Sequence, residues 1–261
     1  MLTPDQIAHL HTFGFLVLRR LFTPDEVALI EREAEEIMAA ARQGHPFDPT
    51  TTQAVQPFFE RRPFMAGLAA DDRIYSLGED VLGPDFLLDG TEGNFHVGDT
   101  PWHGGSGRQT RILPEIKIAF YPQPLAKDSG CLRVIPGTHR TSDPDPFQIL
   151  RQRHDDPDGR PFGLHPSEVP CVLIETEPGD VVVFFEDTLH AAFGGAPGRH
   201  QHAINFVTNP KTDEQLSLLH ELYEQHRFGF HPAESYIHSK EPRLRRIVGR
   251  LVELGFKSSK V

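Results

Sequence analysis

Apolar and polar positions follow two different patterns along the chain. In the first 42 residues, Thr3-Pro4 and Thr23-Pro24 are helix-start signals, and apolar residues at helical spacing follow the second of them. A short apolar run at residues 14–18 lies between these signals and predicts a strand. Residues 43–62 show no periodicity and predict a surface loop, while residues 63–83 predict a further helical region.

From residue 86 onward the pattern changes to short β-prone runs that Gly- and Pro-containing turns separate. The predicted strands are residues 86–88, 116–121, 132–135, 171–175, 181–185 and 203–208. A Pro-, Asp- and Arg-rich insertion at 140–168 interrupts them, and residues 212–226 and 241–254 again favour helix. Short strands with frequent turns are typical of an antiparallel sandwich or barrel. We therefore expect a mainly-β protein with flanking helices.

The expected organisation is one domain over residues 1–261. It comprises a helical cap at 1–85, a β core at 86–210 and C-terminal helices at 211–261. No apolar run approaches 18 residues, so we expect no membrane span. No secretory signal is visible, and the two cysteines do not suggest a disulfide framework, so we expect a cytoplasmic protein.

The charge balance narrows the classes of partner. The chain has 26 Lys and Arg against 37 Asp and Glu, a net charge of −11, which disfavours nucleic acid and anionic membranes. A carrier protein would need a local basic patch, and the arginines at positions 243, 245, 246 and 250 are better explained as a solvated helix face. We therefore expect a small, free-standing substrate and no carrier protein.

Candidate chemistry lies in three segments of the β core. They are Thr100-Pro101-Trp102-His103-Gly104-Gly105, the run from Pro178-Gly179-Asp180 through an apolar strand to His190, and the run from Gly198-Arg199 to Asn205-Phe206. A histidine at the end of a strand is well placed to bind a metal through its neutral imidazole. One such histidine is more often structural, but His103 and His190 form a candidate pair. Arg199 follows on the next predicted strand.

The motifs resemble those of the phytanoyl-CoA dioxygenase family of iron(II)- and 2-oxoglutarate-dependent oxygenases. The resemblance rests on the opening stretches 2–21 and 22–37, on the block Asp128-Ser129-Gly130-Cys131-Leu132-Arg133-Val134-Ile135-Pro136-Gly137-Thr138-His139, and on residues 179–190. It implies a double-stranded β-helix, or jelly roll, with iron at its mouth and O2 and 2-oxoglutarate as co-substrates. It also implies His103 and His190 as iron ligands and a structural role for His139.

The sequence departs from the family pattern at one position. The family's first metal motif is His-x-Asp, which completes a triad of two histidines and one carboxylate. Here the motif reads His103-Gly104-Gly105, and Gly105 has no side chain that could bind the metal. By resemblance to iron-dependent halogenases, where the acid is replaced by glycine or alanine, chloride would occupy this position.

Two other interpretations stay open at this point. A different carboxylate could replace the missing one, and the nearby candidates are Asp99, Glu186 and Asp187. Such an enzyme would be a hydroxylase, with that carboxylate or water as the third ligand. Alternatively, the metal site is inactive and the protein only binds a ligand. Retention of both histidines and of an arginine argues against an inactive site, and we favour the halide interpretation over the other two.

Further residues are candidates for binding the co-substrate and the substrate. Arginine binds a carboxylate with two parallel hydrogen bonds, so Arg199 is the candidate for the distal carboxylate of 2-oxoglutarate. If Arg199 lies on a strand, residues 199 and 201 share one face, and His200 and His202 share the other. Lys117 and Tyr121 share a face on another strand and are further co-substrate candidates. The substrate candidates are Asn94, Phe95, His96, Trp102, Arg108 and Arg111.

The sequence therefore predicts an iron- and 2-oxoglutarate-dependent halogenase. It would chlorinate an unactivated C–H bond of a small molecule in specialised metabolism, such as antibiotic biosynthesis, with a nucleoside or nucleotide as one candidate substrate. The basic residues that follow His103 motivate that candidate.

Overall fold

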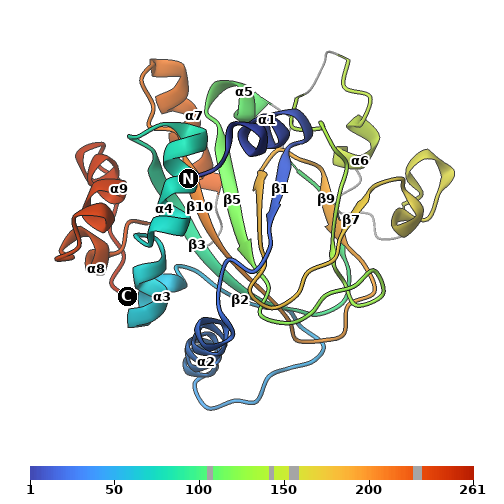
Figure 1. Cartoon of the computed structure of the whole chain (residues 1–261), viewed down its shortest axis with the longest axis horizontal. Coiled ribbons are helices and arrows are strands. Elements are labelled where there is room, and N and C mark those ends of the chain that lie inside the picture. The colour runs from blue at the N-terminus through green and yellow to red at the C-terminus, as the bar shows by residue number, and fades with distance from the viewer. Residues whose placement is uncertain (105–107, 141–143, 153–158, 226–230) are drawn as a thin grey trace.

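Two antiparallel sheets form the core of the computed structural model, which describes residues 1–104, 108–140, 144–152, 159–225 and 231–261 (Figure 1). The larger sheet has the order β1 (Phe15–Leu18), β8 (Val181–Phe185), β5 (Glu115–Phe120), β10 (Arg199–Val207), β3 (Leu87–His96) and β2 (Gln53–Val55). The smaller sheet has the order β4 (Thr100–His103), β9 (His190–Ala192), β6 (Leu132–Val134) and β7 (Val172–Ile174). This arrangement confirms the predicted mainly-β sandwich.

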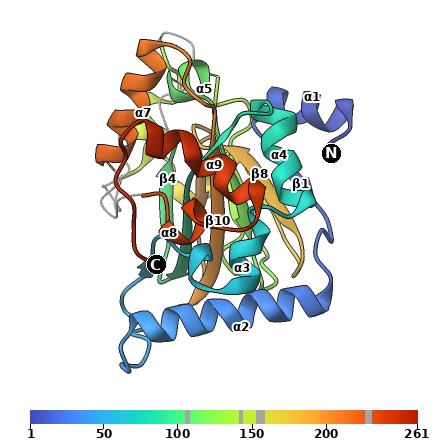
Figure 2. The same cartoon turned by 90° about the vertical axis from the view of Figure 1, so that its left-hand side faces the viewer.

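Helices from both ends of the chain cover the outer face of the six-stranded sheet (Figure 2). They are α1 (Pro4–Phe13), α2 (Pro24–Ala41), α3 (Pro63–Leu68), α4 (Asp72–Leu82), α8 (Glu234–Ile237) and α9 (Pro242–Glu253). Capping boxes begin α1 and α2, because Thr3 and Thr23 each exchange hydrogen bonds with the residue three positions later. The remaining helices are α5 (Arg108–Ile112), α6 (Gln148–Gln152) and α7 (Asp213–Gln225), with 3-10 turns at Phe59–Arg61, Pro161–Gly163 and Pro166–Glu168.

The strands alternate between two environments, as their sequence period requires. On β5, Ile116, Ile118 and Phe120 face the helices and belong to the main apolar core. Lys117 on β5 and Tyr121 directly after it line the cavity between the sheets. On β8, Phe184 faces inward and Phe185 faces the helices. Strand β5 therefore packs against the helices on one side and places Lys117 at the cavity on the other.

The structure corrects several predicted element bounds. The prediction of a loop over residues 43–62 is wrong at β2 and at the 3-10 turn Phe59–Arg61, because β2 gains its order by pairing Gln53 with Phe95 on β3. Strands β4 and β9 were not predicted, since each is short and they are stabilised by pairing with other strands. Helix α8 was also missed, and β3 extends well beyond the predicted residues 86–88.

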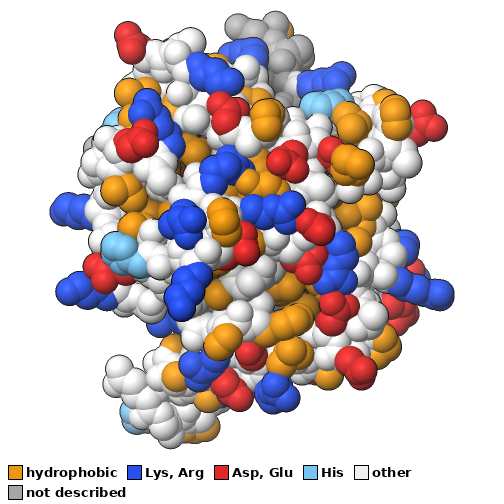
Figure 3. All heavy atoms as spheres, turned by 60° about the vertical axis from the view of Figure 1, so that its left-hand side comes forward, with side chains coloured by type: hydrophobic (Ala, Val, Ile, Leu, Met, Phe, Trp, Pro, Cys, Tyr) orange, Lys and Arg blue, Asp and Glu red, His pale blue; other side chains and the backbone are white. Residues whose placement is uncertain are grey.

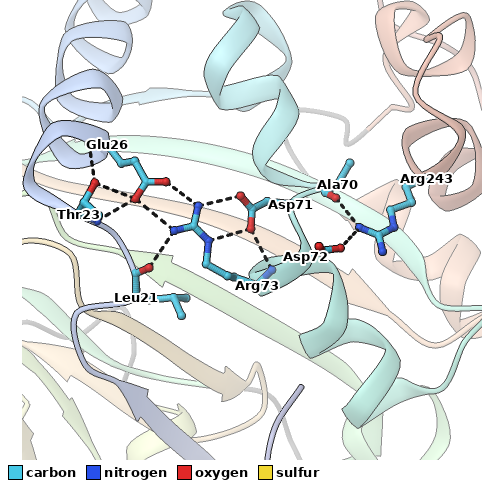
Figure 4. Close-up of polar contacts among 8 residues, drawn as sticks. All are labelled: Leu21, Thr23, Glu26, Ala70, Asp71, Asp72, Arg73 and Arg243. Atoms are coloured by element: carbon cyan, nitrogen blue, oxygen red, sulfur yellow. Dashed lines mark hydrogen bonds and ion pairs between the residues drawn. The ribbon is translucent and has the colours of Figure 1, made fainter.

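Arginines tie the helical cap together instead of forming a basic surface (Figure 4). Arg73 on α4 pairs with Glu26 on α2 at 2.7 Å and donates to the carbonyl of Leu21 at 3.0 Å. On α9, Arg243 pairs with Asp72 at 2.5 Å, and the Arg246 guanidinium lies 4.4 Å from the centre of the Phe86 ring. Figure 3 shows cationic and anionic side chains interspersed over one face of the molecule. Arg243 and Arg246 are therefore engaged in contacts within the chain, and they are not simply solvated as the sequence suggested.

Among the residues that the structure describes, we find no helix with the length and apolar character needed to cross a membrane.

Candidate active site

A cavity of about 200 Å³ lies between the two sheets, and both sheets contribute side chains to it. Its walls are formed by Glu92, Asn94, His96, Thr100, His103, Lys117, Tyr121, Gly130, Leu132, Phe184, His190, Ala191, Ala192, Arg199 and Gln201. The cavity therefore brings together both predicted metal ligands and all three predicted co-substrate residues.

His103 and His190 lie side by side at one wall of this cavity. They are paired across β4 and β9, and their ring centroids are 3.9 Å apart. Each Nδ1 lies on a backbone carbonyl oxygen, at 2.8 Å from Pro101 for His103 and at 2.7 Å from Thr188 for His190. A carbonyl that accepts from Nδ1 fixes the tautomer and directs Nε2 to a metal, which is the usual support of a histidine ligand.

Electrostatics keep His190 in the form that a metal requires. Burial, followed by the charges of His103 and Lys117, holds the pKa of His190 well below its ordinary value. The imidazole is therefore neutral at pH 7 and presents a lone pair. Backbone packing also fixes the residue that follows His103, since a Cβ at Gly104 would lie 2.8 Å from the carbonyl oxygen of Thr188.

Arg199 supplies a buried cation to the same cavity. Its side chain enters from β10, where the residue is only 5 % exposed, and its Nη2 donates to Thr100 Oγ1 at 3.3 Å. Its Nη1 is buried and has no hydrogen-bond partner among the described residues. Burial lowers the pKa of this guanidinium, although arginine stays charged in proteins. A buried donor of this kind requires an acceptor, and a carboxylate of a bound ligand would provide one.

Two glycines make the space that Arg199 occupies. A Cβ added at Gly130 would lie 2.0 Å from Arg199 Nη1, and one added at Gly195 would lie 2.4 Å from it. Gly130 has a φ of +84°, which L side chains rarely adopt, whereas Gly195 lies outside that region. The local sequence thus keeps the guanidinium in a fixed recess beside the cavity.

Lys117 lines the cavity but is already engaged by two carboxylates. Its Nζ lies 2.9 Å from Glu92 and 3.1 Å from Glu186. Burial alone would lower the pKa of Lys117, but the adjacent carboxylates outweigh that effect and raise it above the ordinary value. Lys117 therefore remains charged, and it neutralises the carboxylates that surround it.

The remaining polar wall consists of neutral groups. Asn94 Nδ2 donates to Gln201 Oε1 at 2.9 Å, and burial together with the charge of Arg199 lowers the pKa of His96 to about 4. Burial likewise raises the pKa of Tyr121 well above its ordinary value, so its hydroxyl keeps its proton. These side chains can recognise a ligand by hydrogen bonds without adding charge.

The described residues contain no group of three or more His, Cys, Asp or Glu side chains that could hold a metal ion. The three acids considered as substitutes have other contacts: Asp99 accepts from the amide of Gly194 at 2.7 Å, Glu186 pairs with Lys117, and Asp187 accepts from the amide of Thr110 at 2.6 Å. Gly105, the position at which the family has its carboxylate, lies outside the described residues.

The structure separates several predicted substrate residues from the cavity. Phe95 lies on the opposite face of β3, where its ring stacks on His200 at 3.8 Å, so it belongs to the outer core. Trp102 packs against Phe193 and donates to the carbonyl of Pro166 at 2.8 Å. Arg111 lines a different cavity, described below. The Arg108 side chain lies outside what the structure describes.

Strand alternation explains which residues of β3 and β10 line the cavity. Asn94 and His96 line the cavity, whereas Phe95 between them does not. Glu92, two residues before Asn94, lies on the same face of β3 and also lines the cavity, but it was not predicted. Thr100, Gly130 and Gln201 were also missed. The period of two along β3 and β10 could have identified Glu92 and Gln201, whereas Gly130 is brought to the cavity only by folding.

The described residues fit the groups that the motifs imply. Two imidazoles whose Nδ1 atoms contact backbone carbonyl oxygens suit a divalent iron ion, and the buried donor of Arg199 suits a carboxylate of 2-oxoglutarate. A jelly-roll sandwich with such a site defines the class of cupin-like non-haem iron oxygenases. The family model for "Phytanoyl-CoA dioxygenase (PhyH)" matches residues 10–200, and the chain belongs to this family.

Characterised relatives include ectoine dioxygenases. The chain is 26% identical to the ectoine dioxygenase of Sphingopyxis alaskensis over 211 residues, which cover 69% of this chain and 67% of that protein. It is 27% identical to the ectoine dioxygenase of Nocardia farcinica over 157 residues, or 52% of this chain and 51% of the relative. The chain thus spans two thirds of the first of these relatives and about half of the second.

Solved structures confirm the fold. HygX from Streptomyces hygroscopicus, in a structure with nickel and 2-oxoglutarate bound, superimposes with a TM-score of 0.65 at 20% identity and covers 81% of this chain and 89% of HygX. The epimerase SnoN from nogalamycin biosynthesis superimposes with a TM-score of 0.58 at 17% identity and covers 78% of this chain and 81% of SnoN.

Proposed function

We propose that this chain is an iron(II)- and 2-oxoglutarate-dependent halogenase that chlorinates a C–H bond of a small, free-standing molecule. The observation that carries the proposal is the pair His103 and His190 with Gly105 in the place of the family's carboxylate. The absence of a third metal-binding side chain among the described residues supports it, since iron would then have a coordination position for an external anion.

The side chains of the cavity have separable roles in this proposal. His103 and His190 would hold the metal, and Arg199 would bind the distal carboxylate of 2-oxoglutarate and so orient its keto acid toward the histidines. Bound iron, together with O2, would supply the oxidising power that breaks the substrate C–H bond. The neutral wall of Asn94, Gln201 and His96 would position the substrate by hydrogen bonds.

The overall reaction balances with chloride as the halogen source. Substrate R–H, 2-oxoglutarate, O2, chloride and one proton give R–Cl, succinate, carbon dioxide and water. Arg199 and the missing acid reduce the negative charge near the metal, which favours binding of an anion there, whereas Lys117 is offset by Glu92 and Glu186.

The ectoine dioxygenase relatives favour a second candidate, a hydroxylase in which water takes the third ligand position. Both candidates share the iron and 2-oxoglutarate site and differ in the response to halide. A third candidate, a binding protein without catalysis, would bind neither iron nor 2-oxoglutarate productively.

A spectroscopic titration separates the three candidates. Purified protein with iron(II) and 2-oxoglutarate under anaerobic conditions should show a metal-to-ligand charge-transfer band, and chloride should shift that band. A band that does not respond to chloride supports the hydroxylase, and the absence of a band together with the absence of iron binding supports the binding protein. Gly105→Asp should remove the response to chloride, whereas the matched variant Gly105→Ala should retain it.

A further inference from the structure

A second cavity, of about 330 Å³, lies on the outer face of the six-stranded sheet. Strand β8 separates it from the iron cavity, because Phe184 lines the iron cavity and its neighbour Phe185 lines the second one. The residues that give the second cavity its character are His11, Thr110, Arg111, His139, Arg140 and Phe185. The lining residues of the two cavities do not overlap, so this cavity is not an extension of the iron site.

The second cavity is positively charged in an otherwise acidic protein. Arg111 and Arg140 line it and no described Asp or Glu does, although the chain as a whole carries a net charge of −11. Both arginines are exposed, and neither guanidinium forms an ion pair with another residue in the described ranges. Two exposed guanidinium groups at one cavity favour an anionic ligand, because arginine binds carboxylate and phosphate with parallel hydrogen bonds.

The floor of the cavity is aromatic and rigid. The His139 ring lies parallel to the Phe185 ring at 5.0 Å between centroids, and the His11 ring lies 5.5 Å from the same phenylalanine. His139 Nε2 contacts the carbonyl oxygen of His11 at 3.1 Å, and a Cβ at Gly14 would come within 2.5 Å of His139 Nδ1. The packing on Gly14 therefore fixes this ring in place.

The surroundings of His11 and His139 favour the neutral form of both imidazoles. Burial, and then the charge of Arg140, lowers the pKa of His11, and the same two effects lower the pKa of His139. The half-buried His11 ring meets the cavity beside the buried rings of Phe185 and His139, and the cationic groups are left to the arginines. A ligand that suits both features has a compact planar body and one anionic group.

We propose that this second cavity is a binding site for a small aromatic or cyclic organic anion, a carboxylate or a phosphate, separate from the iron site. The anionic group is held by Arg111 and Arg140, and the planar body lies against Phe185 and the two histidines. Because Arg111 belongs to α5, a ligand bound there contacts the helix that follows the segment carrying His103.

Isothermal titration calorimetry with benzoate, phenyl phosphate and neutral benzyl alcohol tests the proposal. At least one of the two anions should bind at one per chain and at least tenfold more tightly than the alcohol, and the stronger anion identifies carboxylate or phosphate as the preferred group. The double variant Arg111→Gln/Arg140→Gln should weaken anion binding at least tenfold. Arg32→Gln, the same charge change on an exposed position of α2, should leave it within twofold.

A further variant separates this site from the iron cavity. Arg199→Gln removes the buried cation of the iron cavity and should leave binding of the anion unchanged. The proposal is overturned if neither anion binds, if benzyl alcohol binds as tightly, or if binding survives loss of both Arg111 and Arg140. Loss of binding in Arg199→Gln would also overturn it, because the probe would then occupy the iron cavity. None of these outcomes depends on whether the protein is a halogenase.

Discussion

The recess around Arg199 provides a sharp test of its role in binding 2-oxoglutarate. In Gly195→Ala the new Cβ would lie 2.4 Å from Nη1 and 3.2 Å from Cζ of Arg199, where ordinary contacts begin at 3.4 Å. Arg199 is 5 % exposed and Gly130 closes the recess as well, so the guanidinium would have to shift by about 1 Å. The backbone at Gly195 lies outside the positive-φ region, so alanine should not strain it.

The expected cost follows from the hydrogen bond that is displaced. A hydrogen bond to a charged group contributes about 1.5–3 kcal/mol, which corresponds to a loss of roughly 10- to 100-fold in affinity for 2-oxoglutarate. The dissociation constant would be measured by anaerobic titration of the iron(II) protein, and thermal unfolding would verify that the variant is folded. Gly249→Ala is the matched control, because a Cβ there meets no atom within 4 Å. A folded Gly195→Ala protein that binds 2-oxoglutarate within twofold of the parent would refute the role assigned to Arg199.

Three further predictions concern the metal ligands, the vacant position and a buried acid. His103→Ala and His190→Ala should each lower iron(II) affinity by at least tenfold in equilibrium dialysis, and full retention of iron by both would contradict their assignment as ligands. Gly105→Asp should abolish chlorination, with or without gain of hydroxylation, when products are analysed by mass spectrometry. Undiminished chlorination would show that chloride does not need the position left free by Gly105. Burial raises the pKa of Glu60 to about 7 from 4.5, so the folded state holds this proton more tightly than the unfolded chain. The free energy of unfolding should therefore fall by up to about 3 kcal/mol as the pH rises through the range between those two values. Glu60→Gln should flatten this dependence in urea titrations at pH 5 and pH 8, and an unchanged slope would exclude Glu60 as its source.

Local sequence signals predicted much of the fold and the pair of histidines that the structure brings together at one cavity. The capping boxes at Thr3 and Thr23 and the apolar runs of β5 and β8 depend on neighbours in the chain, so the pattern contained them. The pairing of His103 with His190 depends on β4 and β9, two short strands that exist because they bind other strands. In this case the motifs identified the residues, although the strands themselves were not predicted.

Long-range packing accounts for what the sequence did not reveal. The recess at Gly130 and Gly195 involves segments far apart in the chain, and the second cavity combines residues from α1, α5, β8 and the turn at His139. Phe95 was assigned to the substrate because residues 94–96 precede the metal motif, although strand alternation places it against His200. Because successive side chains of a strand point to opposite faces, strand alternation predicts which residues line the cavity better than proximity in sequence does.

A crystal structure of the protein with iron(II), 2-oxoglutarate and bromide would show directly whether a halide takes the metal position that the family's carboxylate fills. We expect a bromide anomalous signal bonded to the metal that His103 and His190 would hold, at the position where the family has its carboxylate. A carboxylate oxygen of the protein, or a water molecule that bromide at high concentration does not displace, at that coordination position would contradict it.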